Sequence, residues 1–178
     1  VSNLAAGAAD PASGTIQTSC PVPSVPAGSY YVMALVDPGN SVSESNEANN
    51  VTSTAVTISG VDVVPTSITA SRSGSAKVLV SDAFKNQGNQ PANSFKIRYY
   101  LSENTTYDSG DIALAKNSDG GICERSSSEN TGNKTCHKPR GALDRKPYYV
   151  LVVVDATSQV VEYNEINNAK ATAGTLQW

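Results

Sequence analysis

Alternating apolar and polar positions predict β-strands along most of this chain. The clearest run covers residues 95–102, where Phe, Ile, Tyr and Leu alternate with Lys, Arg, Tyr and Ser, the two-residue period of a strand with one buried and one solvated face. Residues 78–84 keep the same period and lead to an Asn-Gln-Gly-Asn sequence at 86–89 that suits a turn. No stretch has convincing helical spacing, and turn clusters separate segments of strand length. The pattern predicts an all-β fold, an antiparallel β-sandwich.

Two segments depart from this simple alternation. Asp82 falls in the inward phase of the strand that contains Val78 and Val80, so either a bulge shifts it or it has a buried partner. Residues 148–154 and their counterpart at 30–36 are apolar on both faces. A strand of that kind needs cover on both sides, from the core on one face and from a neighbour on the other.

The chain contains an internal repeat. A Tyr-Tyr-Val sequence at 30–32 recurs at 148–150, and Asp37 recurs as Asp155, which gives an offset of 155 − 37 = 118 residues. Six further positions keep this offset without a gap: Val42, Glu44, Asn46, Glu47, Asn49 and Asn50 correspond to Val160, Glu162, Asn164, Glu165, Asn167 and Asn168. Chance does not produce that register, and the offset is about the size of a small domain.

The two copies differ in extent. Residues 60–178 are long enough for a whole module, with a Cys-bearing insertion at 117–140, whereas residues 1–59 correspond to the C-terminal half of a module. We therefore expect two tandem modules, of which the first is incomplete and open to completion by another chain. Because the single junction at Ser59 and Gly60 leaves little slack, we expect a stiff rod.

The motifs of the second copy follow one another in a characteristic order. They are Val61-Asp62-Val63-Val64, Lys85-Asn86-Gln87-Gly88, the strands at 95–102 and 148–155, and a terminal Glu-x-Asn-Glu-x-Asn-Asn sequence at 162–168. This order resembles a CARDB module, the cell-adhesion-related domain of bacterial and archaeal surface proteins, and residues 37–50 match the same terminal signature. The resemblance implies an immunoglobulin-like sandwich and an extracellular repeat, but no particular ligand.

The composition argues against several classes of function. Thirteen Lys and Arg against sixteen Asp and Glu give a net charge of −3, so the chain has no basic footprint for nucleic acid or anionic lipid. No apolar run approaches the roughly 20 residues of a membrane-spanning helix. The single histidine, His137, and the lack of a Gly-x-Ser-x-Gly sequence argue against His-based metal catalysis and most acyl-transfer triads. We expect no enzymatic activity, no nucleic-acid partner and no membrane insertion.

The chain contains three cysteines, of which two can form a disulfide within the second copy. Cys123 and Cys136 bracket a polar stretch, and a disulfide between them would stabilise the fold by roughly 3 kcal/mol. The alternative is two free thiols, which is less typical of a secreted chain. Cys20 is left over, so it has a partner outside this sequence, pairs between chains, or is free.

Three Asn-x-Thr sequons could accept an N-linked sugar. They begin at Asn50, Asn104 and Asn133. Such triplets arise often by chance in an Asn- and Thr-rich chain, and modification needs a host with the machinery.

Each copy of the repeat also gathers carboxylate and amide oxygens that suit Ca²⁺. The candidate ligands are Asp37, Glu44, Asn46 and Glu47 in the first copy and Asp155, Glu162, Asn164 and Glu165 in the second. The alternative is structural: Asn and Asp side chains close turns on their own backbone, and the Glu side chains cap nearby amides. The spacing differs from that of the twelve-residue calcium loop, which favours the structural alternative.

Three hypotheses for function result. The first is a non-catalytic structural or adhesive repeat at the cell surface or outside the cell, whose partners are copies of itself or neighbouring repeats. The second is a subunit of an extracellular filament in which strands of a neighbouring chain complete the first module. The third is an accessory calcium- or carbohydrate-binding module of a secreted hydrolase. The aromatic residues expected to be exposed for stacking on a sugar form no obvious platform; they are Tyr100, Tyr107, Tyr163 and Trp178.

Overall fold

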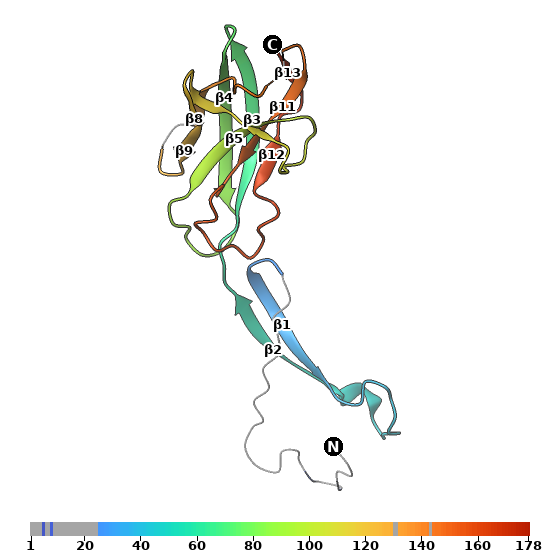
Figure 1. The fold of residues 1–178 in the computed structure, drawn as a ribbon. Coiled ribbons are helices and arrows are strands. Elements are labelled where there is room, and N and C mark those ends of the chain that lie inside the picture. Colours follow the sequence, from blue (N-terminus) through green and yellow to red (C-terminus); the bar gives the residue numbers. More distant parts are fainter. Residues whose placement is uncertain (1–4, 6–7, 9–24, 130–131, 143) are drawn as a thin grey trace.

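The computed structural model describes residues 5, 8, 25–129, 132–142 and 144–178. In these residues the chain forms β-strands and one short 3-10 helix, which confirms the all-β class (Figure 1). No helix in the described part of the chain has the length and apolar character needed to cross a membrane.

The described residues form thirteen strands and one 3-10 helix. In chain order they are β1 (Gly28–Leu35), η1 (Glu47–Asn49), β2 (Val51–Ile58), β3 (Val63–Ser73), β4 (Lys77–Asn86), β5 (Lys96–Ser102), β6 (Ile112–Ala113), β7 (Ala115–Asn117), β8 (Gly120–Ile122), β9 (Glu124–Ser126), β10 (Asn133–His137), β11 (Pro147–Val153), β12 (Ala169–Ala171) and β13 (Leu176–Gln177).

Strands β3 to β13 form a sandwich of two sheets. One sheet has the strand order β3-β4-β10-β7-β8, and the other has the order β12-β11-β5-β6, with β9 paired to β5 and β13 paired to β11. Every one of these strand pairs is antiparallel. Inward-facing side chains of both sheets meet in one core, which includes Val63, Val78, Val80, Ile97, Tyr99, Leu101, Val150, Val152 and Val154. Strand alternation in the sequence therefore leads directly to the sandwich.

The Cys-bearing stretch at 117–140, which we expected as an insertion, is part of this sandwich. It supplies β8, β9 and β10, and β10 lies between β4 and β7 in its sheet. Its buried residues include Cys123, Arg125 and Cys136. A disulfide and a buried charged group take the place of apolar side chains here, which explains why the stretch has no visible core pattern.

Strand β5 corrects one expectation. Ile97, Tyr99 and Leu101 are buried as predicted, but the opposite face is not solvated throughout, because Tyr100 and Ser102 are buried as well. Tyr100 belongs to a second apolar cluster with Leu151 and Val153 of β11, against which small side chains of β6 and β12 pack. The outer face of β5 is therefore covered where it lies beside β6 and β11.

Asp82 in β4 has a buried partner rather than a bulge. The β3–β4 register is continuous around Asp82, and its one shift lies between Pro65 and Ser67. The Asp82 carboxylate pairs with the Arg125 guanidinium at 2.5 Å and accepts a hydrogen bond of 2.9 Å from the Tyr99 hydroxyl. Burial and the charge of Asp82 raise the pKa of Tyr99, so its hydroxyl stays a donor.

Strands β1 and β2 form a separate two-stranded hairpin, in register from Gly28 opposite Ile58 to Leu35 opposite Val51. The hairpin extends away from one end of the sandwich (Figure 1). The prediction of cover on both faces is confirmed for β11, whose Val150 to Val153 are all buried. It is not met for β1 within the described residues, because most side chains of β1 are exposed on both faces.

Candidate functional site at the module junction

The junction between the hairpin and the sandwich is held by the loop that follows β4. The backbone of Gly60 pairs with Asn89, whose side-chain oxygen accepts from the Gly60 N–H at 3.0 Å and whose amide donates to the Ile58 carbonyl at 3.2 Å. Gln87 donates its backbone N–H to the Asp62 carbonyl and its side-chain amide to the Asp62 carboxylate, both at 2.7 Å. We call Gly60, Asp62, Gln87, Gly88 and Asn89 the junction clamp.

Gly88 is required by the close approach of two backbones. A Cβ atom at this position would lie 2.3 Å from the Gly60 carbonyl oxygen and 2.9 Å from the Asp62 nitrogen. No side chain fits in that space. The glycine that ends the Lys-Asn-Gln-Gly sequence at 85–88 therefore allows this loop to lie against the backbone just before β3.

The loop between β11 and β12 (residues 154–168), which we call the terminal loop, is folded by its own side chains. Asp155 has a left-handed backbone (φ 43°), and its two carboxylate oxygens accept from the N–H groups of Gln159 and Val160 at 2.8 and 2.9 Å. The Glu165 carboxylate accepts from the Glu162 N–H at 2.9 Å, and the Asn164 side chain accepts from the Ile166 N–H. Short side chains that bond to nearby amides give the loop its shape.

Two side chains of the terminal loop reach the opening strand of the same module. The Glu162 carboxylate accepts from the Val63 N–H at 2.6 Å, and the Asn167 amide donates to the Asp62 carboxylate at 3.0 Å. The backbone N–H of Tyr163 also donates to the Val61 carbonyl. We call Glu162 and Asn167 the latch, because they join the end of the module to its start.

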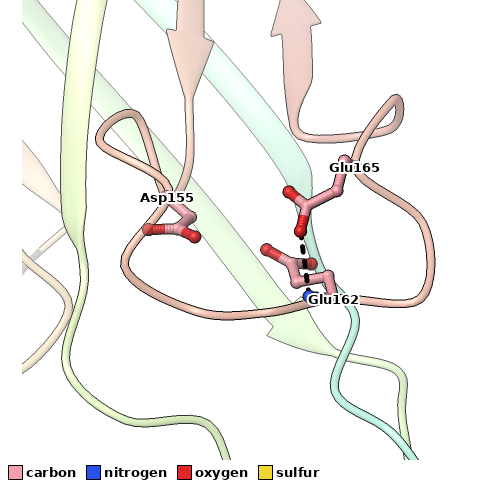
Figure 2. Close-up of side chains that lie close together, drawn as sticks. All are labelled: Asp155, Glu162 and Glu165. Atoms are coloured by element: carbon pink, nitrogen blue, oxygen red, sulfur yellow. Dashed lines mark hydrogen bonds between the residues drawn. The ribbon is translucent and has the colours of Figure 1, made fainter.

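Asp155, Glu162 and Glu165 form a carboxylate cluster in the terminal loop (Figure 2). One oxygen of each lies within 4.8 Å of the others, and Asp155 and Glu162 are buried while Glu165 is exposed. Burial raises the pKa of Glu162 to about 7, and the charges of Glu165 and Asp155 act in the same direction.

Of the four calcium ligands predicted in the second copy, three form this cluster, and the side-chain oxygen of the fourth, Asn164, accepts from the Ile166 N–H. Both oxygens of Asp155 and of Glu162 already accept hydrogen bonds. Ca²⁺ prefers six to eight oxygen ligands, so the observed contacts favour the structural alternative, and calcium binding stays a prediction.

The predicted ligands of the first copy take the same local positions as those of the second. Asp37 accepts from Ser41 and Val42, Glu47 accepts from the Glu44 N–H, and Asn46 caps η1 at the Ala48 N–H. The described part of the chain brings no three carboxylates together in this copy.

The structure joins Cys123 to Cys136 in a disulfide, as the sequence predicts. Cys20 lies outside the described residues. Among the sequon residues, Asn50 is the C-cap of η1, Asn104 is exposed and accepts from the Thr106 N–H, and Asn133 begins β10. Sugar attachment at these sites stays a prediction.

Sequence reasoning missed several residues of this region. The burial of Arg125 could not be expected, because a single Arg in a polar stretch is usually exposed. Gly88 belongs to the Lys-Asn-Gln-Gly motif, which was noted in the sequence, but its contact with the backbone at Asp62 was not predicted. The expectation of an exposed Tyr100 was wrong, since that ring is buried by Leu151 and Val153. The aromatic residue most exposed in the hairpin is Tyr31, which the sequence analysis had assigned to a covered strand.

Comparisons with known proteins give one match. A family model, CARDB, matches residues 1–54 and 60–172. The search of curated proteins and the search of solved structures each found no match. CARDB modules are immunoglobulin-like, adhesion-related and not catalytic, and the immunoglobulin-like fold agrees with the antiparallel sandwich described above. The chain therefore belongs to the CARDB family.

Proposed function

We propose that this chain is a non-catalytic extracellular spacer in an adhesive surface protein, and that its role is to hold neighbouring repeats at a fixed relative orientation. The observation that carries the proposal is the junction clamp. Only four residues, 59–62, separate β2 from β3, and two of them are held by backbone and side-chain bonds to the loop at 87–90. A linker without free rotation transmits orientation from one repeat to the next.

The latch supports the same proposal. Glu162 binds Val63, the first residue of β3, and Asn167 binds Asp62 just before it, so the start of the sandwich is held by the terminal loop and by the loop that follows β4. A pull on β2 is therefore resisted by hydrogen bonds to both loops rather than by a single backbone connection. Resistance to a pulling force suits a repeat that separates a binding part from a surface.

The proposal is tested by ¹⁵N relaxation of the whole chain. Amides of β2 and of β3 should report one rotational correlation time in the wild type. Gly88→Ala places a Cβ 2.3 Å from the Gly60 carbonyl oxygen and should give the hairpin a shorter correlation time than the sandwich. Gly174→Ala is the matched control, because a Cβ there meets nothing within 4 Å.

A second variant covers the case in which Gly88→Ala disturbs folding. Asn89→Ala removes both side-chain bonds to the junction and should loosen the hairpin without a steric clash. Independent tumbling of hairpin and sandwich in the wild type would refute the spacer function.

The exposed hairpin favours a second candidate function, assembly by strand complementation. Isolated two-stranded hairpins are marginally stable in water, and β1 carries large apolar side chains that are exposed in this structure, including Tyr31, Met33 and Leu35. Strands from another polypeptide segment would cover them and pair with the open edge of β1. Negative-stain imaging and sedimentation velocity of the purified chain test this function, since filaments or large assemblies should appear as concentration rises.

A further inference from the structure

The charges of this chain are unevenly distributed between its two copies. Residues 1–60 contain four Asp and Glu and no Lys or Arg, whereas residues 61–178 contain the other twelve carboxylates and all thirteen Lys and Arg. The hairpin and its loop therefore carry only negative side-chain charges, and every Lys and Arg lies beyond the junction. The net charge of −3 does not show this separation.

The end of the sandwich that points away from the hairpin carries the C-terminus (Figure 1). Arg72 of β3 reaches this end, since its guanidinium donates to the Gln177 carbonyl at 2.6 Å. Lys138 lies there too, with its ammonium 5.4 Å from the centre of the Trp178 ring. The Arg145 N–H donates to the Trp178 carbonyl. Three basic residues from separate segments therefore meet at this end.

Three further basic residues adjoin these, across the sheet or along the chain. Lys77 of β4 lies opposite Ser73 of β3 and opposite His137 of β10. Arg140 follows closely after β10, and Lys146 comes directly before β11. We call the whole set the basic end; it consists of Arg72, Lys77, Lys138, Arg140, Arg145 and Lys146.

Most of the basic end is not neutralised by neighbouring carboxylates. Its salt bridges are those of Lys138 with Asp144 and of Lys146 with Glu103. Its other four members are exposed and form no salt bridge with a carboxylate in the described part of the chain. Several unpaired positive charges in one place raise the electrostatic potential there and attract an anionic partner.

The loop between β1 and β2, which we call the acidic loop, lies at the far end of the hairpin from the sandwich (Figure 1). Its Glu44 and Glu47 are exposed. The N–H groups of Val42 and Ser41 lower the pKa of Asp37, which keeps that carboxylate ionised. Because the first copy contains no Lys or Arg, these negative charges have no compensating cation within it.

The acidic loop and the basic end cannot neutralise each other within one molecule. They lie at opposite ends of the structure, with the hairpin and the sandwich between them (Figure 1). The hairpin alone has strands of eight residues, which is a length of about 26 Å. That length exceeds the Debye length of about 10 Å at 0.1 M salt, so attraction between these surfaces acts between molecules.

We infer that the basic end of one molecule binds the acidic loop of a second copy, so that the molecules associate head to tail. This inference goes beyond the spacer function and does not depend on strand complementation. Each copy carries both partners of the contact, and the two surfaces differ, so association gives a row or a ring rather than a two-fold pair. The contact supplies an adhesive interaction between copies of this chain, driven by complementary charge.

The test is sedimentation velocity of the whole 178-residue chain at up to about 1 mM, a range in which weak complexes are detected. The Debye length is about 30 Å in 10 mM NaCl and about 3 Å in 1 M NaCl. The sedimentation coefficient should therefore rise with protein concentration in the first buffer only. Amide signals of the acidic loop and of the basic end should shift in ¹⁵N–¹H spectra under the same conditions.

Hydrogen exchange separates this contact from strand complementation. Head-to-tail association should leave exchange of the β1 amides unchanged, because the contact uses the loop and not the strand edge. Strand complementation would slow exchange at β1, and it would persist in about 1 M NaCl because it buries apolar surface. Either mode of association can therefore fail without the other.

Variants that alter charge assign the two surfaces. Lys77→Glu with Arg140→Glu reverses two exposed charges of the basic end, and Ser43→Lys, Glu44→Lys and Ser45→Lys together make the acidic loop basic. Each of these chains alone should associate about tenfold more weakly or less, because attraction at the contact becomes repulsion. An equal mixture of the two should associate again, since each altered surface then meets its opposite.

Lys85→Glu with Lys170→Glu is the matched control. Both side chains are exposed and lie outside the basic end, and the change in net charge equals that of the basic-end variant. This chain should associate as the wild type does. Equal weakening in the control would show that net charge, and not a specific contact, governs association.

Three further results would overturn the inference. They are no association of the wild type in about 10 mM NaCl, association that is the same in about 1 M NaCl, and a mixture of the two variants that does not associate. Polyglutamate is the probe for a different anionic partner. If it shifts the amides of the basic end while the chain does not self-associate, an anionic polymer rather than a second copy is the occupant.

Discussion

Met33 and Leu151 occupy equivalent positions 118 residues apart, yet Met33 is 66% exposed and Leu151 is 0% exposed. Val36 and Val154 show the same contrast, at 64% and 0%. The terminal loops beside them are nevertheless alike in backbone angles and hydrogen bonds. Local side-chain bonds are thus sufficient for the loop, whereas burial of the strand depends on segments that lie far away in the sequence.

This contrast has an energetic consequence. Full burial of a Val, Leu or Met side chain contributes roughly 1.5–3 kcal/mol. The exposed apolar residues of β1 and its loop do not make that contribution in this structure, while their counterparts in the sandwich do. The hairpin should therefore open more readily than the sandwich, and changes confined to the sandwich core should leave the opening of the hairpin unaltered.

Arg125→Met should have the largest effect, because it leaves the buried carboxylate of Asp82 without its charged partner. Loss of one member of a buried pair costs about 3–5 kcal/mol, and chemical denaturation should show that loss in the sandwich. Exchange of the β1 amides should not change, since the pair lies in the sandwich alone. Arg98→Met is the matched control: its pair with Glu124 is partly exposed, so it should cost less than about 1 kcal/mol.

Removal of the disulfide should have the next largest effect. The Cys123→Ala, Cys136→Ala double variant releases a loop of 13 residues and should lower the free energy of unfolding by roughly 3 kcal/mol. Reduction of the wild type with dithiothreitol should lower it by a similar amount. Equal denaturation midpoints for reduced and oxidised protein would show that the crosslink does not stabilise the sandwich.

The buried carboxylate of Glu162 should make the sandwich less stable as pH rises. Burial raises its pKa from 4.5 to about 7, so between these values the folded state binds a proton that the unfolded state has lost. The protonated Glu162 therefore contributes about 1–3 kcal/mol to the free energy of unfolding. This contribution is complete below about pH 4.5 and is lost as the pH rises toward 7.

Glu162→Gln should remove this pH dependence, measured as the difference from the wild type in denaturation experiments at pH 5 and pH 7.5. Glu44→Gln, at the equivalent exposed position, should leave the slope as it is in the wild type. An unchanged slope in Glu162→Gln would contradict the assignment of the raised pKa to this residue.

Calcium should have the smallest effect. The oxygens of Asp155 and Glu162 accept N–H groups of the backbone and of Asn168, so we expect the melting temperature to change by less than about 1 °C between a chelator and about 1 mM Ca²⁺. A clear rise with Ca²⁺ that Glu165→Gln removes would instead support the calcium site predicted from the sequence.

Some features of the fold could be predicted because they depend on neighbours in the chain. The alternation at 95–102 identified the inward side chains Ile97, Tyr99 and Leu101, and the polar stretch between Cys123 and Cys136 indicated their disulfide. The burial of Tyr100 could not be predicted, because it depends on Leu151 and Val153, some fifty residues later. The sequence could not identify the buried partner of Asp82 either, because Arg125 lies 43 residues later in the chain.

The amino-acid sequence alone indicates the alternating strands such as 95–102, the repeat with its offset of 118 residues, and the family. Periodicity and turn-closing side chains act over a few residues, so they can be read along the chain. The folded structure is needed to show that Glu162 and Asn167 bind the first residues of their own module and that Gly88 lets the junction backbone approach. Those contacts join residues 26 to 105 positions apart, and no local pattern specifies which distant groups the packed sheets bring together.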